Sequence, residues 1–169
     1  MNLSELPMFN AACLCGSLRA RVAGVPARVS VCHCAACQRR TGSAFGAQAK
    51  WPSEMVTLAG PRTTYERTCD SGGTVTSSFC SQCGTTVAWE VSGMPGFTVV
   101  ALGCFTTDSD SEAWVNEGEV TRSNADDDTT VSATESASSC FPEPTFSVYE
   151  SRALPWALRG IPADAEHWD

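Results

Sequence analysis

The sequence predicts a mainly β protein assembled from short antiparallel strands. Glycine and proline interrupt the chain often, with 13 and 9 among its 169 residues. No long segment repeats its apolar residues at the helical spacing, whereas short β-branched or aromatic runs lie between the turn residues. Ten cysteines occur largely at spacings of one or two residues, which favours shared metal ions over disulfides. We therefore expect many strands joined by turns and held together by metal.

The expected strands follow one another along most of the chain. Residues 18–22 alternate apolar and basic side chains, as a half-buried strand does. Arg39 and Arg40 are expected in a short helical turn that follows a cluster of cysteines. The other expected strands are rich in β-branched or aromatic residues and are bounded by Gly, Pro or Ser: 54–58, 74–79, 85–91, 97–102 and 146–149.

The length predicts one domain over residues 1–169. Eleven basic and 19 acidic residues give a net charge of −8, and residues 106–140 carry all of it, with nine acidic residues and one basic residue. We interpret this Ser/Thr-rich segment as an acidic insertion or surface loop. It is either a solvated tether or a lid, because Trp114 and Val115 are unusual in a pure linker.

The charge and the apolar pattern exclude several classes of partner. A pI near 4.7 argues against nucleic acid and anionic membranes. No apolar run approaches the length of a membrane helix, and the N-terminal segment lacks the pattern of a signal peptide. Metal-binding thiolates require a reducing compartment, so we expect a cytoplasmic protein. A homo-oligomer is compatible with the sequence.

Seven cysteines fall into three motifs, C-x-C-G, C-x-C-x-x-C and C-x-x-C-G. A closed structural zinc site takes four ligands, and a catalytic site commonly keeps one position open. The seven divide naturally into two distant pairs that close one site and a triplet that forms another. The spacing also permits other divisions, such as the first pair with part of the triplet. The two pairs are Cys13 with Cys15 and Cys80 with Cys83, and the triplet is Cys32, Cys34 and Cys37.

The triplet leaves one coordination position, and its occupant has several alternatives. Water or a substrate thiol would make the site catalytic, whereas a further protein ligand would close it. His33 lies between two alternating ligands and is therefore expected to point away from their metal. Cys69, Cys104 and Cys140 are otherwise unassigned, and Cys69 is a candidate substrate-binding residue because it lies in a Gly-Ser turn before the C-x-x-C strand.

The three motifs occur in an order that resembles a known enzyme family. C-x-C-G begins at Cys13, C-H-C-x-x-C-x-R-x-x-G begins at Cys32, and F-C-x-x-C-G-T begins at Phe79. The segment S-R-A-L-P-W from Ser151 is similar to the family's closing segment. Together they resemble the glutathione-dependent formaldehyde-activating enzyme family, which includes centromere protein V. The resemblance covers residues 9–105 and 141–160.

The resemblance implies a fold, two metal ions and an activity. The fold would be a β-tent built around two Zn²⁺ ions per chain. The two cysteine pairs would hold the structural zinc, and Cys32, Cys34 and Cys37 would hold the catalytic zinc. The activity would be that of a carbon–sulfur lyase that condenses formaldehyde with glutathione, its co-substrate, or acts on a related glutathione adduct of a metabolite. The alternative is a non-catalytic zinc-binding interaction module similar to centromere protein V.

Substrate contacts are expected next to the triplet, because glutathione carries two carboxylates. Arg39 and Arg40 follow the cluster, and one of them could bind a carboxylate. The alternatives are that both face solvent, or that one contacts a ligand thiolate or a nearby carbonyl. The chain departs from many family members at Gln38, where Arg or Lys is common, and at Ser78, where Arg is common. Both changes are expected to alter how an anionic substrate is held.

Overall fold

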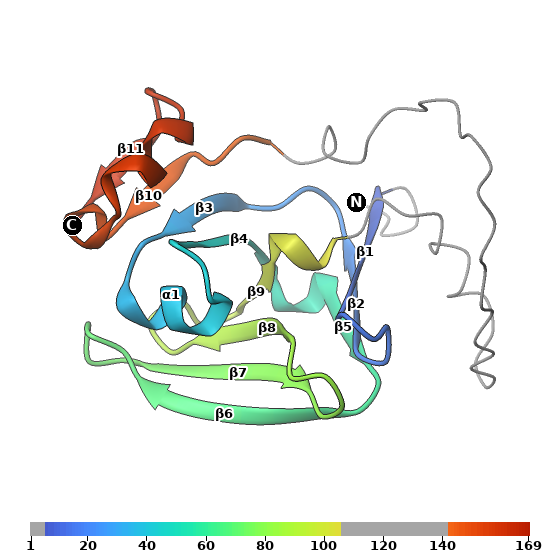
Figure 1. The fold of residues 1–169 in the computed structure, drawn as a ribbon. Helices are drawn as coiled ribbons and strands as arrows, with labels where there is room; N and C mark the ends of the chain where they lie inside the picture. Colours follow the sequence, from blue (N-terminus) through green and yellow to red (C-terminus); the bar gives the residue numbers. More distant parts are fainter. Residues whose placement is uncertain (1–5, 106–141) are drawn as a thin grey trace, which may run out of the picture.

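The computed structural model describes residues 6–105 and 142–169. The fold is mainly β and contains two sheets, as Figure 1 shows. The smaller sheet consists of β1 (Met8–Ala12), β2 (Arg19–Ala23) and β5 (Val56–Ala59), in that order. The larger sheet consists, in spatial order, of β11 (Glu166–Trp168), β10 (Phe146–Val148), β3 (Arg28–Cys32), β4 (Gly46–Pro52), β9 (Phe97–Ala101), β8 (Thr86–Val91), β7 (Thr74–Cys80) and β6 (Arg62–Thr68).

Helices are short in the part of the chain that the structure describes. The α-helix α1 (Ala35–Thr41) follows β3 and contains both arginines of the expected helical turn. None of the helices there has the length and apolar character needed to cross a bilayer. The described residues also form short 3₁₀ helices: η2 (Ser53–Met55), η3 (Leu102–Cys104), η6 (Glu150–Arg152) and η7 (Pro155–Gly160).

The prediction of a mainly β fold is confirmed, and each predicted strand overlaps an observed one. One strand begins later than expected, because the 3₁₀ helix η2 occupies its first two residues. The expectation of purely antiparallel pairing is wrong for β10, which pairs in parallel with both β3 and β11. Parallel pairing needs a long connection between strands, and a local pattern of residues does not reveal which distant strand will be the neighbour.

The acidic segment 106–140 lies outside the described residues.

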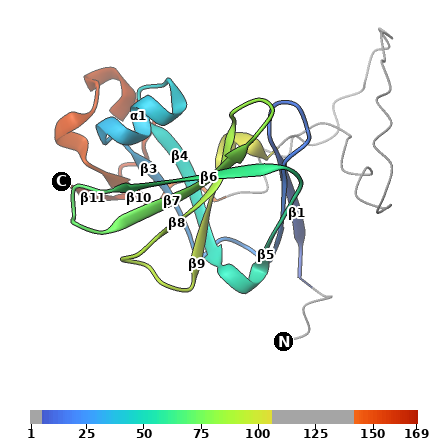
Figure 2. The same cartoon turned by 90° about the horizontal axis from the view of Figure 1, so that it is seen from below.

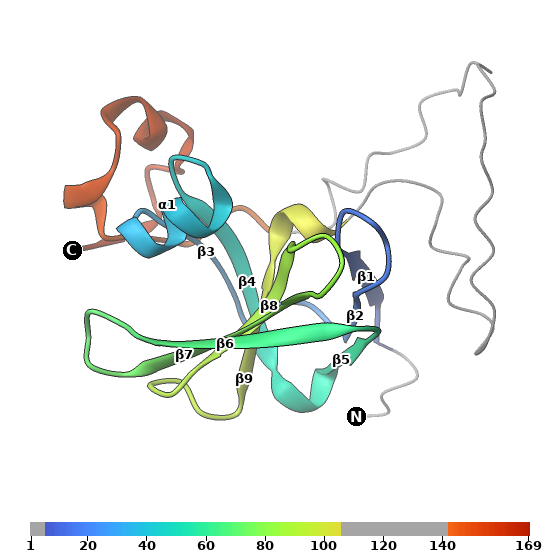
Figure 3. The same ribbon diagram turned by 60° about the horizontal axis from the view of Figure 1, so that its bottom comes forward.

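The larger sheet bends so that its two halves enclose α1, as Figures 2 and 3 show. One face of the sheet packs on the smaller sheet through a core that includes Leu18, Trp51 and Val100. The opposite face, which we name the α1 face, carries α1 and has its own core around Trp89 and Val99. The smaller sheet therefore covers only part of one face, on which Glu90 is exposed, and α1 covers part of the other.

Strand register decides which side chains share the α1 face. Lys50 pairs with Val99, and Val99 pairs with Trp89, so these three side chains form one row across the sheet. Cys32 lies opposite Gly46, and alternation along β3 and β4 places Gln48 and Lys50 on the same face as Cys32. The α1 face thus carries a ligand cysteine and a lysine on neighbouring strands.

Candidate metal centres

The pair Cys13 and Cys15 meets the pair Cys80 and Cys83 where the two sheets join. The four sulfur atoms lie within 4.8 Å of one another, and the Sγ–Sγ distances are 3.5 Å from Cys13 to Cys15 and 3.7 Å from Cys15 to Cys80. A tetrahedral zinc site with Zn–S bonds of about 2.3 Å has sulfur–sulfur edges of about 3.8 Å. The group, which Cys83 completes, therefore fits a closed zinc site.

Tight turns orient backbone N–H groups toward these sulfur atoms. Gly16 and Gly84 follow the two pairs with φ angles of 75° and 76°, a conformation that favours glycine. The Leu18 amide donates a hydrogen bond of 3.2 Å to Cys13 Sγ, and the Gln82 amide donates one of 3.4 Å to Cys80 Sγ. Such N–H donors stabilise thiolate ligands, so the local fold suits the charged form that zinc requires.

The four-cysteine group also connects elements that are distant in sequence. Cys13 directly follows β1 of the smaller sheet, and Cys80 ends β7 of the larger sheet. Their neighbours make additional contacts across this junction, including a 2.8 Å hydrogen bond from the Ser17 hydroxyl to the Gln82 amide oxygen. Cys13 and Cys80 are 4 % and 1 % exposed. A metal ion here would fix one sheet against the other.

The second group is built from the end of one strand and the start of one helix. Cys32 ends β3, Cys34 caps α1, and Cys37 lies within α1. Their sulfur atoms lie within 4.8 Å of one another, and no other His, Cys, Asp or Glu among residues 6–105 and 142–169 joins them. His33 is fully buried against Phe45, with ring centroids 5.8 Å apart, and it does not belong to the group. Three candidate ligands, one fewer than a closed zinc site uses, thus converge from six consecutive residues.

Charge explains why these three thiols suit a cation. Hydrogen bonds from Cys32 and Cys37 lower the pKa of the Cys34 thiol to about 2. The hydrogen bond with Cys34 and a second one with Cys37 raise the pKa of the Cys32 thiol, and burial raises it further. One proton is therefore lost easily, while further thiolates repel one another in a buried site. A soft divalent cation such as Zn²⁺ removes that repulsion, so the donor set fits zinc.

The two arginines of α1 have different surroundings. Arg40 directs its guanidinium inward, 4.0 Å from Cys37 Sγ and 3.9 Å from the ring centroid of Trp89. Gly46 gives it room, because a Cβ at that position would lie 3.0 Å from Arg40 Nη2. Arg39 is exposed on the outer side of the helix. Of these two arginines, the structure therefore places only Arg40 beside the three-cysteine group.

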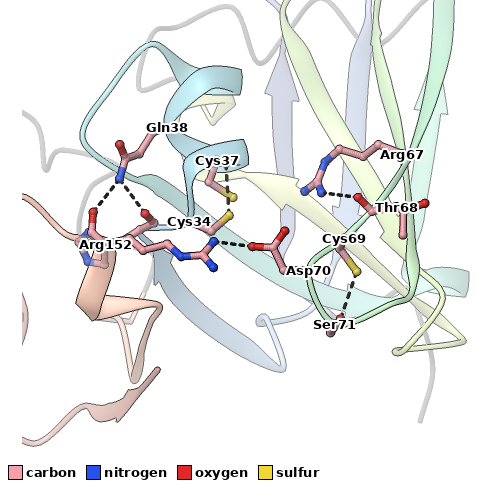
Figure 4. A network of polar contacts seen from close by, with 10 residues as sticks. Cys34, Cys37, Gln38, Arg67, Thr68, Cys69, Asp70, Ser71 and Arg152 are labelled. Carbon is pink, nitrogen blue, oxygen red and sulfur yellow. Dashed lines mark hydrogen bonds and ion pairs between the residues drawn. The ribbon is translucent and has the colours of Figure 1, made fainter.

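Gln38 joins α1 to the C-terminal segment, as Figure 4 shows. Its side-chain amide donates hydrogen bonds to the backbone carbonyls of His33, at 2.7 Å, and Arg152, at 3.1 Å. Arg152 in turn forms an ion pair with Asp70 in the turn between β6 and β7. Two distant segments thus meet beside Cys34. Arg152 was expected only as part of the closing motif, and nothing in the sequence pattern pointed to Asp70.

The cysteines outside the motifs do not complete the group. The Cys69 thiol donates a hydrogen bond of 3.1 Å to the Gly73 carbonyl, in the same turn as Asp70, and its contact with substrate stays a prediction. Cys104 is buried, and burial raises the pKa of its thiol to about 11. Cys140 lies outside the described residues. Within the described part, Cys104 therefore has the surroundings of an ordinary buried thiol.

Comparison with known proteins decides the family. A family model described as "Glutathione-dependent formaldehyde-activating enzyme" matches residues 8–120, about two thirds of the chain. The chain belongs to this family. The match includes every cysteine of the two groups, so both groups lie within the family's own domain. The comparison does not extend to centromere protein V.

The chain is also similar to a protein of known structure. A crystal structure of a Rhodobacter sphaeroides protein is similar at 19 % sequence identity and a TM-score of 0.45. The similarity covers 62 % of this chain and 94 % of that one. No curated protein matches the chain.

Proposed function

We propose that this protein is a zinc-dependent carbon–sulfur lyase. It would add a thiol, with glutathione as the first candidate, to a small carbonyl such as formaldehyde, or reverse that addition. The observation that supports this most is the three-cysteine group, which no fourth ligand from the described residues closes. Structural zinc sites use four protein ligands, whereas catalytic sites keep one position for substrate. A glutathione adduct of a larger metabolite would use the same chemistry.

The two cysteine groups would have different roles. Cys32, Cys34 and Cys37 would hold the catalytic zinc, and the four-cysteine group would hold the structural zinc. Zinc held by three thiolates would be a weak Lewis acid toward water, but it would lower the pKa of a thiol bound to it. The protein's own contribution would be to leave room for that thiol beside the three cysteines and to control its surroundings.

The reaction itself requires little covalent chemistry from the protein. The thiol sulfur forms a bond to the carbonyl carbon, the π electrons of the C=O bond move to oxygen, and that oxygen takes up the proton that the thiol lost. Neither an oxidant nor a reductant is involved. Because thiols add to formaldehyde readily, holding the two reactants together supplies much of the rate.

Arg40 and Gln38 would support that arrangement. The guanidinium of Arg40 places a positive charge beside Cys37, where it offsets the negative charge that three ligand thiolates and a substrate thiolate bring together. Gln38 holds the C-terminal segment against α1, and the Arg152–Asp70 ion pair connects that segment to the β6–β7 turn. These contacts would border the space available to the carbonyl substrate.

The test is the rate at which formaldehyde and glutathione form their adduct, followed by NMR exchange with ¹³C-labelled formaldehyde. The zinc-loaded protein should accelerate the exchange, Cys34→Ser should lose the acceleration while it stays folded, and Cys104→Ser should keep it. Equal exchange rates with and without the wild-type protein would contradict the proposal. In that case, two bound zinc ions would favour the non-catalytic module.

A further inference from the structure

Tyr149 has a backbone conformation that a tyrosine rarely adopts. Its φ and ψ angles are 60° and 45°, and it is the only non-glycine residue with a positive φ angle among residues 6–105 and 142–169. This left-handed conformation is disfavoured for a bulky side chain, so the surrounding structure has to hold it. Strained residues of this kind concentrate at active sites and ligand-binding sites.

Backbone hydrogen bonds hold Tyr149 next to the three-cysteine group. The Tyr149 amide donates a hydrogen bond of 2.7 Å to the carbonyl of Trp168 on β11. The preceding residue, Val148, pairs with Cys32 between the parallel strands β10 and β3, and its carbonyl accepts a hydrogen bond of 3.0 Å from the His33 amide. The backbone of Tyr149 is therefore attached to the segment that carries the thiols.

The phenol of Tyr149 lies in the electric field of the three-cysteine group and of the β6–β7 turn. Burial, followed by the charges of Cys32 and Cys34, raises the pKa of this phenol. The charges of Asp70 and Cys69, both on the β6–β7 turn, raise it further. Because a tyrosine has an ordinary pKa of about 10, the hydroxyl keeps its proton in neutral solution. It can therefore act there as a hydrogen-bond donor.

The ring of Tyr149 is accessible and is also held in place. It lines a pocket of about 390 Å³ together with Val148 and Trp168. The guanidinium of Arg152, which is paired with Asp70 as Figure 4 shows, lies 5.3 Å from the centroid of the ring. A cation–π contact of this kind restrains the orientation of the ring. A small substrate can therefore reach a phenol whose position is fixed in advance.

The other long polar side chains beside the three-cysteine group already have partners. Arg40 contacts a ligand cysteine, and Arg152 pairs with an aspartate. The side-chain amide of Gln38 donates to two backbone carbonyls. In contrast, no hydrogen bond joins the Tyr149 hydroxyl to another residue in the ranges 6–105 and 142–169. Its proton is thus available to an oxygen atom of a substrate.

We propose that Tyr149 is a catalytic residue whose hydroxyl donates a hydrogen bond to the oxygen of the carbonyl substrate. The inference rests on the proposed function. As the bond between sulfur and carbon forms, the π electrons of the C=O bond move to oxygen, and the Tyr149 hydrogen bond stabilises the negative charge that develops there. The oxygen then takes up from solvent the proton that the thiol lost, and Tyr149 keeps its own. A donor fixed in advance loses no freedom at this step, which gives the strained backbone a function.

The first test compares Tyr149→Phe with Tyr65→Phe, each of which removes one hydroxyl and keeps the ring. The chain has only these two tyrosines, and Tyr65 is 60 % exposed on β6. In the NMR exchange assay, Tyr149→Phe should lower kcat at least about tenfold, the effect of one hydrogen bond to a developing charge. The KM for glutathione should stay unchanged, because the contact strengthens only in the transition state. Tyr65→Phe should match the wild-type protein.

The second test measures binding and requires no turnover. S-acetylglutathione carries a carbonyl oxygen on the carbon that is bonded to sulfur, whereas S-ethylglutathione lacks this oxygen. In calorimetric titrations of the zinc-loaded wild-type protein, the acetyl compound should bind about tenfold more tightly than the ethyl compound. Tyr149→Phe should lose this preference, and Tyr65→Phe should keep it. A purely structural role of Tyr149 would instead weaken the binding of both compounds equally and lower the melting temperature of Tyr149→Phe.

Three results would overturn the inference. These are a wild-type rate in Tyr149→Phe, an equal loss of rate in Tyr65→Phe, or a wild-type protein that does not prefer the acetyl compound. Failure of the proposed function is a different result, because the wild-type protein would then not accelerate thiol addition at all. The comparison of the acetyl and ethyl compounds would still decide whether Tyr149 binds a carbonyl oxygen.

Discussion

At the scale of single residues, the contrast between Arg40 and Arg39 gives the sharpest test. Only Arg40 reaches Cys37 Sγ, while its sequence neighbour points away from the group. We expect Arg40→Gln to lower kcat/KM about tenfold, because a charge-assisted contact is lost near the reacting sulfur. Arg39→Gln should change it less than about twofold, since exposed charges contribute little. Steady-state kinetics with zinc analysis would check this, and equal losses would contradict the role given to Arg40.

The sequence could predict which cysteines meet, but not which arginine joins them. Ligand counting predicted a group of four and a group of three, because zinc takes a fixed number of ligands at short spacings. The structure brings together the same two groups. The choice between Arg39 and Arg40 depends on the exact phase of a helix of seven residues, which local propensity does not fix.

Gln38 illustrates a further limit at this scale. Its departure from the common family residue pointed to an altered substrate contact. In the structure its amide instead binds the carbonyls of His33 and Arg152, two residues that lie 119 positions apart in the chain. A contact that depends on the arrival of the C-terminal segment leaves no mark in the local sequence.

At the scale of secondary-structure elements, the four-cysteine group should control stability. It connects β1 to β7, and a structural zinc ion contributes on the order of 10 kcal/mol of folding free energy. We therefore expect Cys80→Ser to unfold the domain or to lower its melting temperature by far more than Cys34→Ser does. Thermal melts of zinc-loaded protein would show the difference, and equal melting temperatures would contradict this division of roles.

The loop between β5 and β6 provides a second prediction about stability at the scale of secondary-structure elements. Gly60 has a φ angle of 104°, and a Cβ there would lie 1.9 Å from the Ser17 carbonyl oxygen, next to the first cysteine pair. Gly60→Ala must displace backbone, at a cost of about 1–3 kcal/mol, so its melting temperature should fall by about 2–12 °C. Gly93→Ala meets no neighbour within 4 Å and serves as the control. A fall of the same size in both variants would contradict this explanation.

Two of the strands that the sequence analysis did not predict, β4 and β6, lack the usual alternation of apolar side chains. In β4, the residues that alternate are small or polar, since Gly46 and Gln48 lie where larger apolar side chains would mark a strand. In β6, nearly every residue is exposed, so the hydrophobic alternation that reveals a strand is absent. Both strands are specified by their neighbours in the sheet more than by their own sequence.

At the scale of the whole molecule, all seven motif cysteines precede the acidic, Ser/Thr-rich segment 106–140, whose composition is typical of a surface loop. We therefore expect that deletion of residues 108–138, within the acidic segment, leaves two zinc ions bound and thiol addition intact. Elemental analysis and the NMR exchange assay would measure these. Loss of either zinc ion would show that the segment belongs to the folded core.

The sequence predicted the class of the fold, but it did not predict which distant strands are neighbours in the sheet. Frequent turn residues and short β-branched runs predicted a mainly β fold, because those are local properties. The parallel placement of β10 beside β3, which brings Arg152 to Gln38 of α1 and to Asp70 of the β6–β7 turn, depends on contacts between distant segments. It is this long-range packing that shapes the candidate active site.

The most direct test of the account is zinc stoichiometry combined with the cobalt spectrum. The account predicts two metal ions in the wild-type protein, one in Cys34→Ser, and a change in the absorption spectrum of the cobalt-substituted wild-type protein when glutathione is added. Two metal ions that Cys34→Ser retains, or a cobalt spectrum that glutathione leaves unchanged, would show that the three-cysteine group is not an open thiol-binding centre.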